Sequence, residues 1–302
     1  MIKVDNLRVQ YGDFVAVDDI SFSVAPQEIF GIIGPNGAGK TSAIECIEGL
    51  RRPYSGEVSV LGLNPWKDRK ELHQLIGVQL QDTAYQDNAR VWELCQLFSA
   101  LYPNPAPYQE LLETMGLEEK KKSFISSLSG GERQKLSIVL ALIPNPKLVF
   151  LDELTTGLDP HARHQMWDLL LQLRAGGLTI VIISHFMDEV EAICDRVGVM
   201  ENGRLVTQGP VSQVSNKFNL GSKITFTAPQ LQAGELDGIS NVTSVSLNHG
   251  TVTVLCQGED CLPEILTYLR DKGIPYSNLS VTRPGLEEVF LKLVEQSKAQ
   301  SG

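Results

Sequence analysis

Apolar and polar residues alternate at the start of the chain. From Ile2 to Ala25 the alternation runs on either side of Tyr11-Gly12-Asp13, a pattern that predicts antiparallel strands joined by turns. A short apolar run, Ile29 to Ile33, follows and ends in a glycine-rich turn. Such a run is typical of a strand that is buried on both faces. A helix is predicted next, from Lys40 to about Leu50.

Helical and strand patterns then alternate through the middle of the chain. Residues 91–122 have helical apolar spacing, which prolines at positions 103, 105 and 107 interrupt. The next predicted elements are a helix over Gly131–Ala141, a strand over Leu148–Leu151, a helix over Ala162–Arg174 and a strand over Thr179–Ile183. Alternation of this kind predicts a parallel core sheet covered by helices.

The pattern changes after about Leu220. Val242–Leu247 and Thr251–Cys256 flank Asn248-His249-Gly250, which predicts a hairpin. Two helical apolar stripes follow, over Leu262–Leu269 and Leu286–Val294. We therefore expect a large domain over residues 1–220 and a small α+β domain over residues 221–302.

Composition narrows the classes of function. The chain has 302 residues and a net charge of −10, which argues against nucleic-acid binding and against electrostatic docking on an anionic membrane. The sequence shows no secretory signal and no apolar run long enough to span a bilayer. Any transport path must then belong to another subunit. Five scattered cysteines are expected to be reduced cytosolic thiols: Cys46, Cys95, Cys194, Cys256 and Cys261.

A phosphate-binding motif follows the strand at Ile29–Ile33. The run Gly34-Pro35-Asn36-Gly37-Ala38-Gly39-Lys40-Thr41 fits G-x-x-x-x-G-K-[ST] and lies between a strand and a helix. Its glycines let backbone N–H groups close around phosphate oxygens, and the helix start adds positive charge. Lys40 is placed to reach the β- and γ-phosphates, and the Thr41 hydroxyl to bind Mg²⁺; Ser42 belongs to the same nucleotide-binding stretch.

Two acids end the apolar strand at Leu148–Leu151. Asp152 and Glu153 stand at its carboxyl end, the edge at which open α/β sheets bind ligands. Asp152 is the expected Mg²⁺-side carboxylate, and Glu153 is the expected general base for an attacking water. Together with the phosphate loop, these acids predict a nucleoside triphosphatase.

The stretch between these motifs indicates the kind of triphosphatase. Leu128-Ser129-Gly130-Gly131-Glu132-Arg133-Gln134 resembles the LSGGQ signature of the ABC ATPase family, with Glu132 at the frequent Gln position. Ser129, Gly130 and Gly131 at a helix start also make an anion-binding N-terminus. The resemblance covers residues 1 to about 220. It implies an α/β P-loop NTPase fold of the ABC type, with a mixed core sheet, an antiparallel β subdomain and a helical subdomain.

The resemblance also assigns roles to residues outside these motifs. It implies that Gln81 contacts Mg²⁺ and the lytic water, with Gln79 as the alternative register, and that His185 contacts the γ-phosphate. Tyr11 matches the aromatic residue that stacks on adenine, and Val17 the residue that packs near the ribose. The loop Thr156-Gly157-Leu158-Asp159-Pro160 matches the loop that links the two active sites of a dimer.

One departure from the family pattern lies beside the general base. The family usually has proline after the catalytic glutamate, and this chain has Leu154. Loss of the proline restriction on φ is expected to loosen the loop between Glu153 and Asp159.

The resemblance implies partners as well. The chain holds one set of half-sites, so two subunits are expected to enclose two ATP molecules head to tail, as a homodimer or with a paralogue. A separate permease subunit is expected to dock near Gln81 and residues 82–102, where Tyr85, Trp92 and Phe98 are candidate contacts. The protein is then cytoplasmic and reaches the membrane only through the permease.

The run Pro284-Gly285-Leu286-Glu287-Glu288-Val289-Phe290-Leu291 resembles the ending of ATPases that pair with ABC-2-type exporters of drugs, antibiotics or polymers. Export is therefore the favoured role. An importer ATPase and a soluble ABC ATPase without a transport role remain alternatives. Long heptad arms like those of DNA-repair ABC ATPases do not fit between Lys40 and Ser129.

Overall fold

The protein divides into two compact units, Met1–Val211 and Ser212–Gly302. The division falls at the start of the helix α8 (Val211–Lys217), whereas the change of sequence pattern was placed at residue 220. The computed structural model describes residues 1–79, 85, 88–217, 222–232, 234–248, 250–256, 261–282 and 285–286.

A six-stranded sheet forms the centre of the first unit. Its strands lie in the order β5 (Ile76–Gln79), β6 (Leu148–Asp152), β7 (Thr179–Ile183), β3 (Ile29–Ile33), β8 (Arg196–Glu201) and β9 (Arg204–Pro210). The first five are parallel, as the alternation predicts, and β9 pairs antiparallel with β8. Positive φ angles at Asn202 and Gly203 make the tight turn between β8 and β9, the residue types that such hairpin turns prefer.

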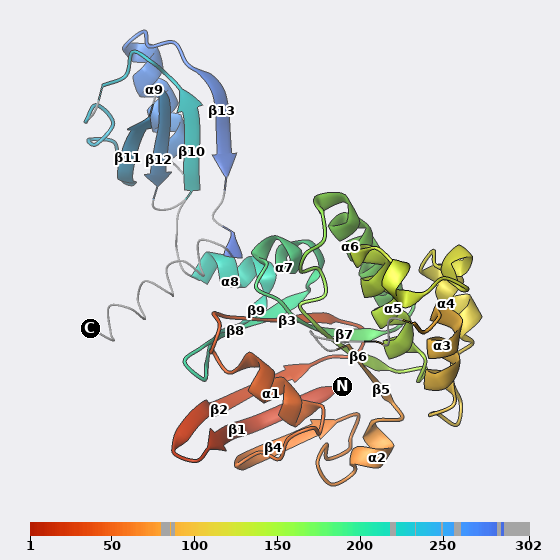
Figure 1. Ribbon diagram of the computed structural model, residues 1–302. Coiled ribbons are helices and arrows are strands. Elements are labelled where there is room, and N and C mark those ends of the chain that lie inside the picture. Colours follow the sequence, from red (N-terminus) through yellow and green to blue (C-terminus); the bar gives the residue numbers. More distant parts are fainter. Residues whose placement is uncertain are drawn as a thin grey trace. The chain divides into compact units, whose positions relative to one another are not determined.

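The two faces of this sheet belong to two hydrophobic cores. In β6, Val149 and Leu151 pack with the helices, whereas Leu148 and Phe150 pack toward the antiparallel sheet, because successive side chains of a strand point to opposite faces. The helical side (Figure 1) holds α3 (Val91–Ser99), α4 (Tyr108–Thr114), α5 (Gly130–Leu142) and α6 (Pro160–Ala175). The other side holds α1 (Lys40–Ile47) and an antiparallel sheet in the order β2 (Phe14–Val24), β1 (Ile2–Tyr11) and β4 (Ser55–Val60).

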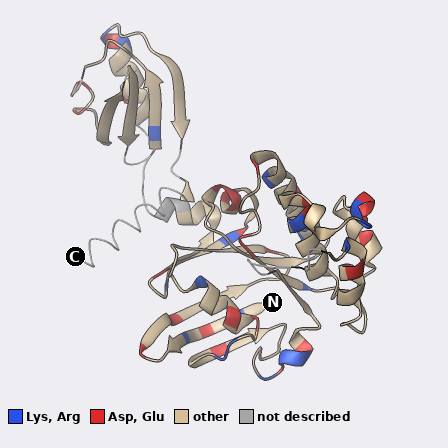
Figure 2. Ribbon diagram, viewed as in Figure 1, with Lys and Arg blue, Asp and Glu red and all other residues tan. Residues whose placement is uncertain are grey.

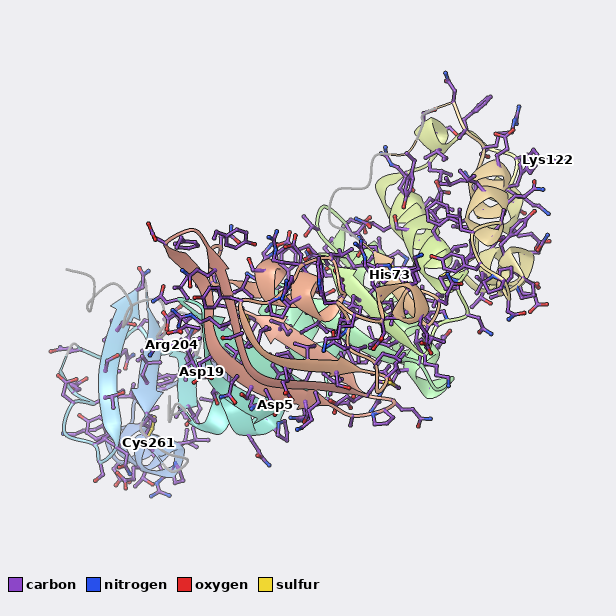
Figure 3. The ribbon with its side chains drawn as sticks, turned by 90° about the horizontal axis from the view of Figure 1, so that it is seen from below. Asp5, Asp19, His73, Lys122, Arg204 and Cys261 are labelled. Carbon is purple, nitrogen blue, oxygen red and sulfur yellow. A yellow bond between two sulfur atoms is a disulfide. The ribbon has the colours of Figure 1, made fainter. Side chains whose placement is uncertain are left out.

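Shorter helical elements complete the first unit. They are α2 (Arg69–Leu72), the 3₁₀ turns Glu118–Lys120 and Ile125–Ser127, and α7 (Met187–Ile193). Figure 3 labels His73, whose ring nitrogen lies 2.8 Å from the Glu48 backbone oxygen, a structural contact beneath α1. Figure 2 shows both signs of charge interspersed over α3, α4 and α5. Within the described residues, no helix is both long enough and apolar enough to cross a bilayer.

In the described part of the second unit, an antiparallel sheet packs against the helix α9. Its strands lie in the order β11 (Val242–Asn248), β12 (Thr251–Cys256), β10 (Ser222–Thr227) and β13 (Ser277–Thr282). The helix α9 (Cys261–Asp271) buries Ile265 and Leu269 in a core with Phe226. Asn248 pairs with Thr251, which confirms the predicted hairpin.

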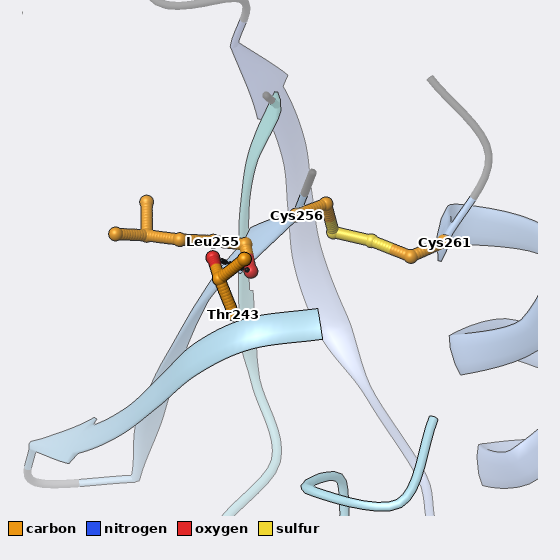
Figure 4. The surroundings of a disulfide bond; sticks show 4 residues. All are labelled: Thr243, Leu255, Cys256 and Cys261. Atoms are coloured by element: carbon orange, nitrogen blue, oxygen red, sulfur yellow. Dashed lines mark hydrogen bonds between the residues drawn. A yellow bond between two sulfur atoms is a disulfide. The ribbon is translucent and has the colours of Figure 1, made fainter. Parts of the chain in front are cut away.

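A disulfide corrects the expectation that all five cysteines are reduced. Cys256 at the end of β12 is bonded to Cys261 at the start of α9 (Figure 4), with their Cα atoms 6.2 Å apart. The two cysteines show no recognisable spacing motif in the sequence, and the disulfide links the end of β12 to the start of α9. The other three, Cys46, Cys95 and Cys194, are free thiols.

Candidate functional site

The phosphate loop joins β3 to α1 and closes around Lys40. A Cβ atom on Gly39, whose φ is +93°, would lie 2.3 Å from the Ala16 backbone oxygen. One on Gly34 would lie 2.2 Å from the Met200 oxygen. Only glycine fits such close backbone approaches. The Lys40 ammonium donates to the Gly34 and Pro35 carbonyl oxygens, at 2.8 and 3.0 Å.

The charge of Lys40 lies beside the two predicted acids. Burial lowers the pKa of Lys40, while the negative charges of Glu153 and Asp152 oppose that shift. The lysine therefore sits between the loop and the end of β6. Along the same loop Asn36, Gly37 and Thr41 are exposed, whereas Ala38 packs inward.

Asp152 ends β6 in a partly buried position. Burial and the neighbouring charge of Glu153 raise its pKa to about 6, against the effect of Lys40. Its backbone N–H donates to the Gln79 side-chain oxygen at 3.0 Å. Gln79, the alternative register, thus lies beside Asp152, and Gln81 lies outside the described residues.

Glu153 and His185 come together from the ends of neighbouring strands. The Glu153 Oε1 atom lies 3.1 Å from the His185 Nδ1 atom. The backbone N–H of Glu153 also donates to Ile183 at 2.9 Å, which ties the ends of β6 and β7. Glu153 has φ of +48°, a left-handed conformation that costs a non-glycine residue about 1–2 kcal/mol. Surrounding structure must hold this residue in place.

Leu154 supplies part of that restraint. Its side chain is fully buried in the core shared by the helices and the sheet. The loop also closes on itself through backbone hydrogen bonds from Thr156 to Glu153 and from Leu158 to Thr155, both 3.2 Å. Packing at Leu154 therefore restrains the loop in place of the family's proline.

The predicted adenine and ribose contacts differ in exposure. Tyr11 is exposed, and its hydroxyl lies 3.1 Å from the Ser42 hydroxyl. The Arg51 guanidinium lies 4.5 Å from the centre of the Tyr11 ring, a contact that no motif in the sequence indicated. Val17 is fully buried and packs beside Gly39 of the phosphate loop; its predicted place near the ribose stays a prediction.

The signature residues begin α5. Ser129 is the N-cap residue, and its hydroxyl accepts from the Glu132 N–H at 3.3 Å. The Glu132 carboxylate accepts from the Ser129 N–H at 2.8 Å and pairs with Lys120 at 3.1 Å. These reciprocal bonds form a capping box, which is the structural use of glutamate at the position usually held by glutamine. Gly130 has open space around it, and Gly131 lies beside the loop at Leu158.

The donors around Lys40 fit a nucleotide with a divalent cation. The Thr41 hydroxyl and the open backbone of Gly37 lie on the same stretch of chain as Lys40, and the Asp152 carboxyl at the end of β6 interacts electrostatically with the Lys40 ammonium. The pKa of Asp152, raised because its charge is poorly solvated, indicates a carboxylate that a cation would stabilise.

Comparison with known proteins also indicates an ATP-binding protein. The family model described as "ABC transporter" matches residues 17–156, and the one described as "ATP-binding protein DrrA1-3-like, C-terminal domain" matches residues 209–294. The chain is 36% identical over 299 residues to Nod factor export ATP-binding protein I of Burkholderia orbicola (strain AU 1054), covering 97% of this chain and 96% of that protein. The chain belongs to the ABC transporter ATP-binding family.

Other proteins similar to this ABC ATPase are named as ATP-binding proteins or as parts of ABC transporters. Linearmycin resistance ATP-binding protein LnrL of Bacillus subtilis (strain 168) is 31% identical, over 97% of this chain and 98% of that protein. A solved ATP-binding subunit of an ABC transporter is similar with a TM-score of 0.66 and 27% identity, over 72% of this chain and 93% of that chain. CbiO1 from Clostridium perfringens is similar with a TM-score of 0.63 and 29% identity, over 72% and 94%.

The predicted α/β fold and ABC ATPase family are therefore confirmed. The protein is an ATP-binding, ATP-hydrolysing subunit of the ABC transporter type. Of the predicted site residues, the structure brings together Lys40, Asp152, Glu153 and His185.

Proposed function

We propose that this ABC ATPase hydrolyses Mg-ATP at the Lys40–Glu153 site to power export through a separate permease. The 3.1 Å contact between Glu153 and His185, beside the buried Lys40, carries the assignment of the site. Lys40, His185 and the loop from Gly34 to Ser42 bind and orient the triphosphate. Thr41, Asp152 and Gln81 would hold Mg²⁺, and the bound cation would neutralise charge on the β- and γ-phosphates. Glu153 takes a proton from the water whose oxygen bonds to the γ-phosphorus. The bond from the γ-phosphorus to the bridging oxygen breaks at the same time, its electron pair stays with ADP, and inorganic phosphate is the second product.

A second subunit completes the site in this proposal. Ser129, Gly130 and Gly131 of one subunit cover the ATP held by the other, and the exposed Ser129 and Gly130 support this. Tyr11 stacks on adenine with the ring face that Arg51 leaves open. ATP binding then closes the dimer and hydrolysis opens it.

Export is favoured by the relatives, which are named for Nod factor export and for linearmycin resistance. The permease would dock on the cytoplasmic side, at α3 and the turn that follows it, where the Leu97 and Leu101 side chains are 59% and 62% exposed. Tyr85 and Phe98, by contrast, pack partly into the core. An importer ATPase is the alternative.

Glu153→Gln tests the general base. We expect turnover to fall by about 10²–10⁴-fold while ATP binding remains and a dimer accumulates in Mg-ATP on gel filtration. Glu113→Gln, an exposed acid on α4, is the matched control and should behave as the parent protein. A variant that stays monomeric in Mg-ATP contradicts the two-subunit site.

Lys40→Ala tests the phosphate loop. We expect calorimetry to show no measurable ATP binding, because the only loop ammonium facing the two acids is gone. Lys70→Ala, at an exposed lysine of α2, should bind normally. If Lys40→Ala binds ATP with unchanged affinity, the assignment of Gly34–Thr41 as the phosphate-binding loop is wrong.

The transport role is tested by purification from native membranes. A polytopic permease should co-purify with the parent protein. The double variant Leu97→Glu and Leu101→Glu should recover less of that permease. If a solute-binding protein co-purifies with the ATPase, the result would instead indicate import.

A further inference from the structure

A buried carboxyl lies behind the site, in α7. Glu189 is 0% exposed, and Ser184 beside it is 1% exposed. The Ser184 hydroxyl donates to the Glu189 Oε2 atom at 2.5 Å. The same hydroxyl accepts from the Phe186 N–H at 3.1 Å. The carboxyl thus fixes the backbone on both sides of His185.

Two further buried polar groups lie close to the Glu189 carboxyl. Thr155, which is 0% exposed, and the indole of Trp167 on α6 are both close enough to Glu189 to hold its pKa down, whereas burial raises that pKa. Thr155 Oγ1, Trp167 Nε1 and Glu189 Oε1 make no standard hydrogen bond within the described part of the chain. The hydroxyls of Ser184 and Thr155 and the indole N–H of Trp167 thus surround the Glu189 carboxyl. We refer to Glu189, Ser184, Thr155 and Trp167 as the polar cluster.

This cluster touches both loops that carry the proposed chemistry. Thr155 lies two residues after Glu153, and Ser184 lies immediately before His185. Between them runs the backbone hydrogen bond from Glu153 to Ile183, 2.9 Å long. Glu153 and His185 meet at 3.1 Å only if the two loops keep a fixed separation.

A buried carboxyl is costly to keep unless its oxygens are hydrogen-bonded. Glu189 is shielded from solvent, so its hydrogen-bonding partners inside the protein must compensate for its burial. We infer that Glu189 is a positioning residue that holds the Glu153 loop and the His185 loop in register for hydrolysis. The inference rests on the proposed function of Glu153 and His185.

Glu189→Leu and Glu189→Gln separate positioning from packing. Leucine fills a similar volume without accepting hydrogen bonds, whereas glutamine keeps an acceptor for Ser184. We expect Glu189→Leu to lower kcat by at least 10-fold with ATP affinity changed less than 2-fold. Glu189→Gln should recover most of kcat. Glu191→Leu, at an exposed acid of the same helix, is the matched control and should keep the parent kcat.

Two smaller substitutions cover the case in which Glu189→Leu fails to fold. Thr155→Val and Ser184→Ala each remove one hydroxyl of the cluster and leave the backbone unchanged. Each should lower kcat without weakening ATP binding. Combined with Glu189→Gln, Ser184→Ala should lower kcat by less than the product of the two single effects, because both act through one hydrogen bond.

The inference is overturned if Thr155→Val and Ser184→Ala both keep the parent kcat, or if kcat and ATP affinity fall together in proportion to lost thermal stability. The proposed function fails separately, if Glu153→Gln retains full turnover. If the cluster variants keep full turnover while Glu153→Gln is inactive, the positioning role of Glu189 is refuted and the proposed function stands.

Discussion

Glu48, at the end of α1, is a second acid held inside the first unit. It is 3% exposed, and burial together with the charges of Asp152 and Glu45 raises its pKa to about 8. Because the folded-state pKa lies above the ordinary value of 4.5, the fold favours the protonated form. The contribution of Glu48 to the free energy of unfolding is therefore most favourable below pH 4.5. It becomes less favourable as the pH rises, and above about pH 8 it no longer changes.

Glu48→Gln is expected to stabilise the protein at high pH. Each pKa unit corresponds to about 1.36 kcal/mol, so removing the ionisable group should recover a few kcal/mol at pH 9 and little at pH 4.5. Thermal melting of parent and variant at both pH values measures the difference, with Glu113→Gln as the exposed control. An equal change in Tm at the two pH values would mean that Glu48 ionises normally in the fold.

At the scale of elements, the loop from Glu153 to Asp159 decides how well the site is held. One end begins at β6, and the other ends at Asp159, whose carboxylate caps α6 by accepting from the His161 and Ala162 N–H groups at 3.0 Å each. These bonds hold the pKa of Asp159 below its usual range. Leu154 and Thr155, both fully buried, anchor the middle. The loop is thus fixed at three points.

Leu154→Ala should loosen the loop without touching a reacting group. Large-to-small changes at buried leucines cost about 2–5 kcal/mol, so we expect a fall in Tm together with a lower kcat. Leu279→Ala removes the same atoms from an exposed side chain on β13 of the second unit and should change neither the Tm nor kcat. Parent-like stability in Leu154→Ala would show that the loop is restrained elsewhere.

At the scale of the whole molecule, the two units have separate cores. The core around Phe226 and Val254 belongs to the second unit, and the two cores of the first unit lie on the faces of the six-stranded sheet. Every residue proposed for ATP lies within Met1–Val211. The second unit is therefore not needed to build the nucleotide site.

A chain ending at residue 220 should fold and bind ATP within about 3-fold of the parent affinity, because it keeps the whole sheet and both of its cores. Calorimetric titration with ATP, together with circular dichroism, measures this. The same fragment carrying Lys40→Ala is the control and should not bind. A fragment that is unfolded, or that binds more than 10-fold more weakly, would show that the second unit supports the first.

Local features were predictable from the sequence because neighbouring residues determine them. The phosphate loop needs glycine at fixed positions within six residues, which the sequence shows directly. The predicted limits of the strands β3 and β7 also match the structure. The hairpin of β11 and β12 follows from its turn residues, and Asp152 and Glu153 follow from their place after an apolar strand. The resemblance to ABC ATPases added the signature, and the relatives confirmed the family.

The sequence by itself thus determined the family, the core strands and the order of the motifs. Tertiary structure alone decided which distant side chains meet, because that depends on strand order and on the face each residue presents. In the folded protein Val17 is buried and the Arg51 guanidinium lies over the Tyr11 ring. Cys256 is bonded to Cys261, and the Gln79 side chain accepts a hydrogen bond from the Asp152 N–H. Tertiary structure also gathered Ser184 and Glu189 behind His185, a contact between side chains whose spacing in the chain carries no recognisable signal.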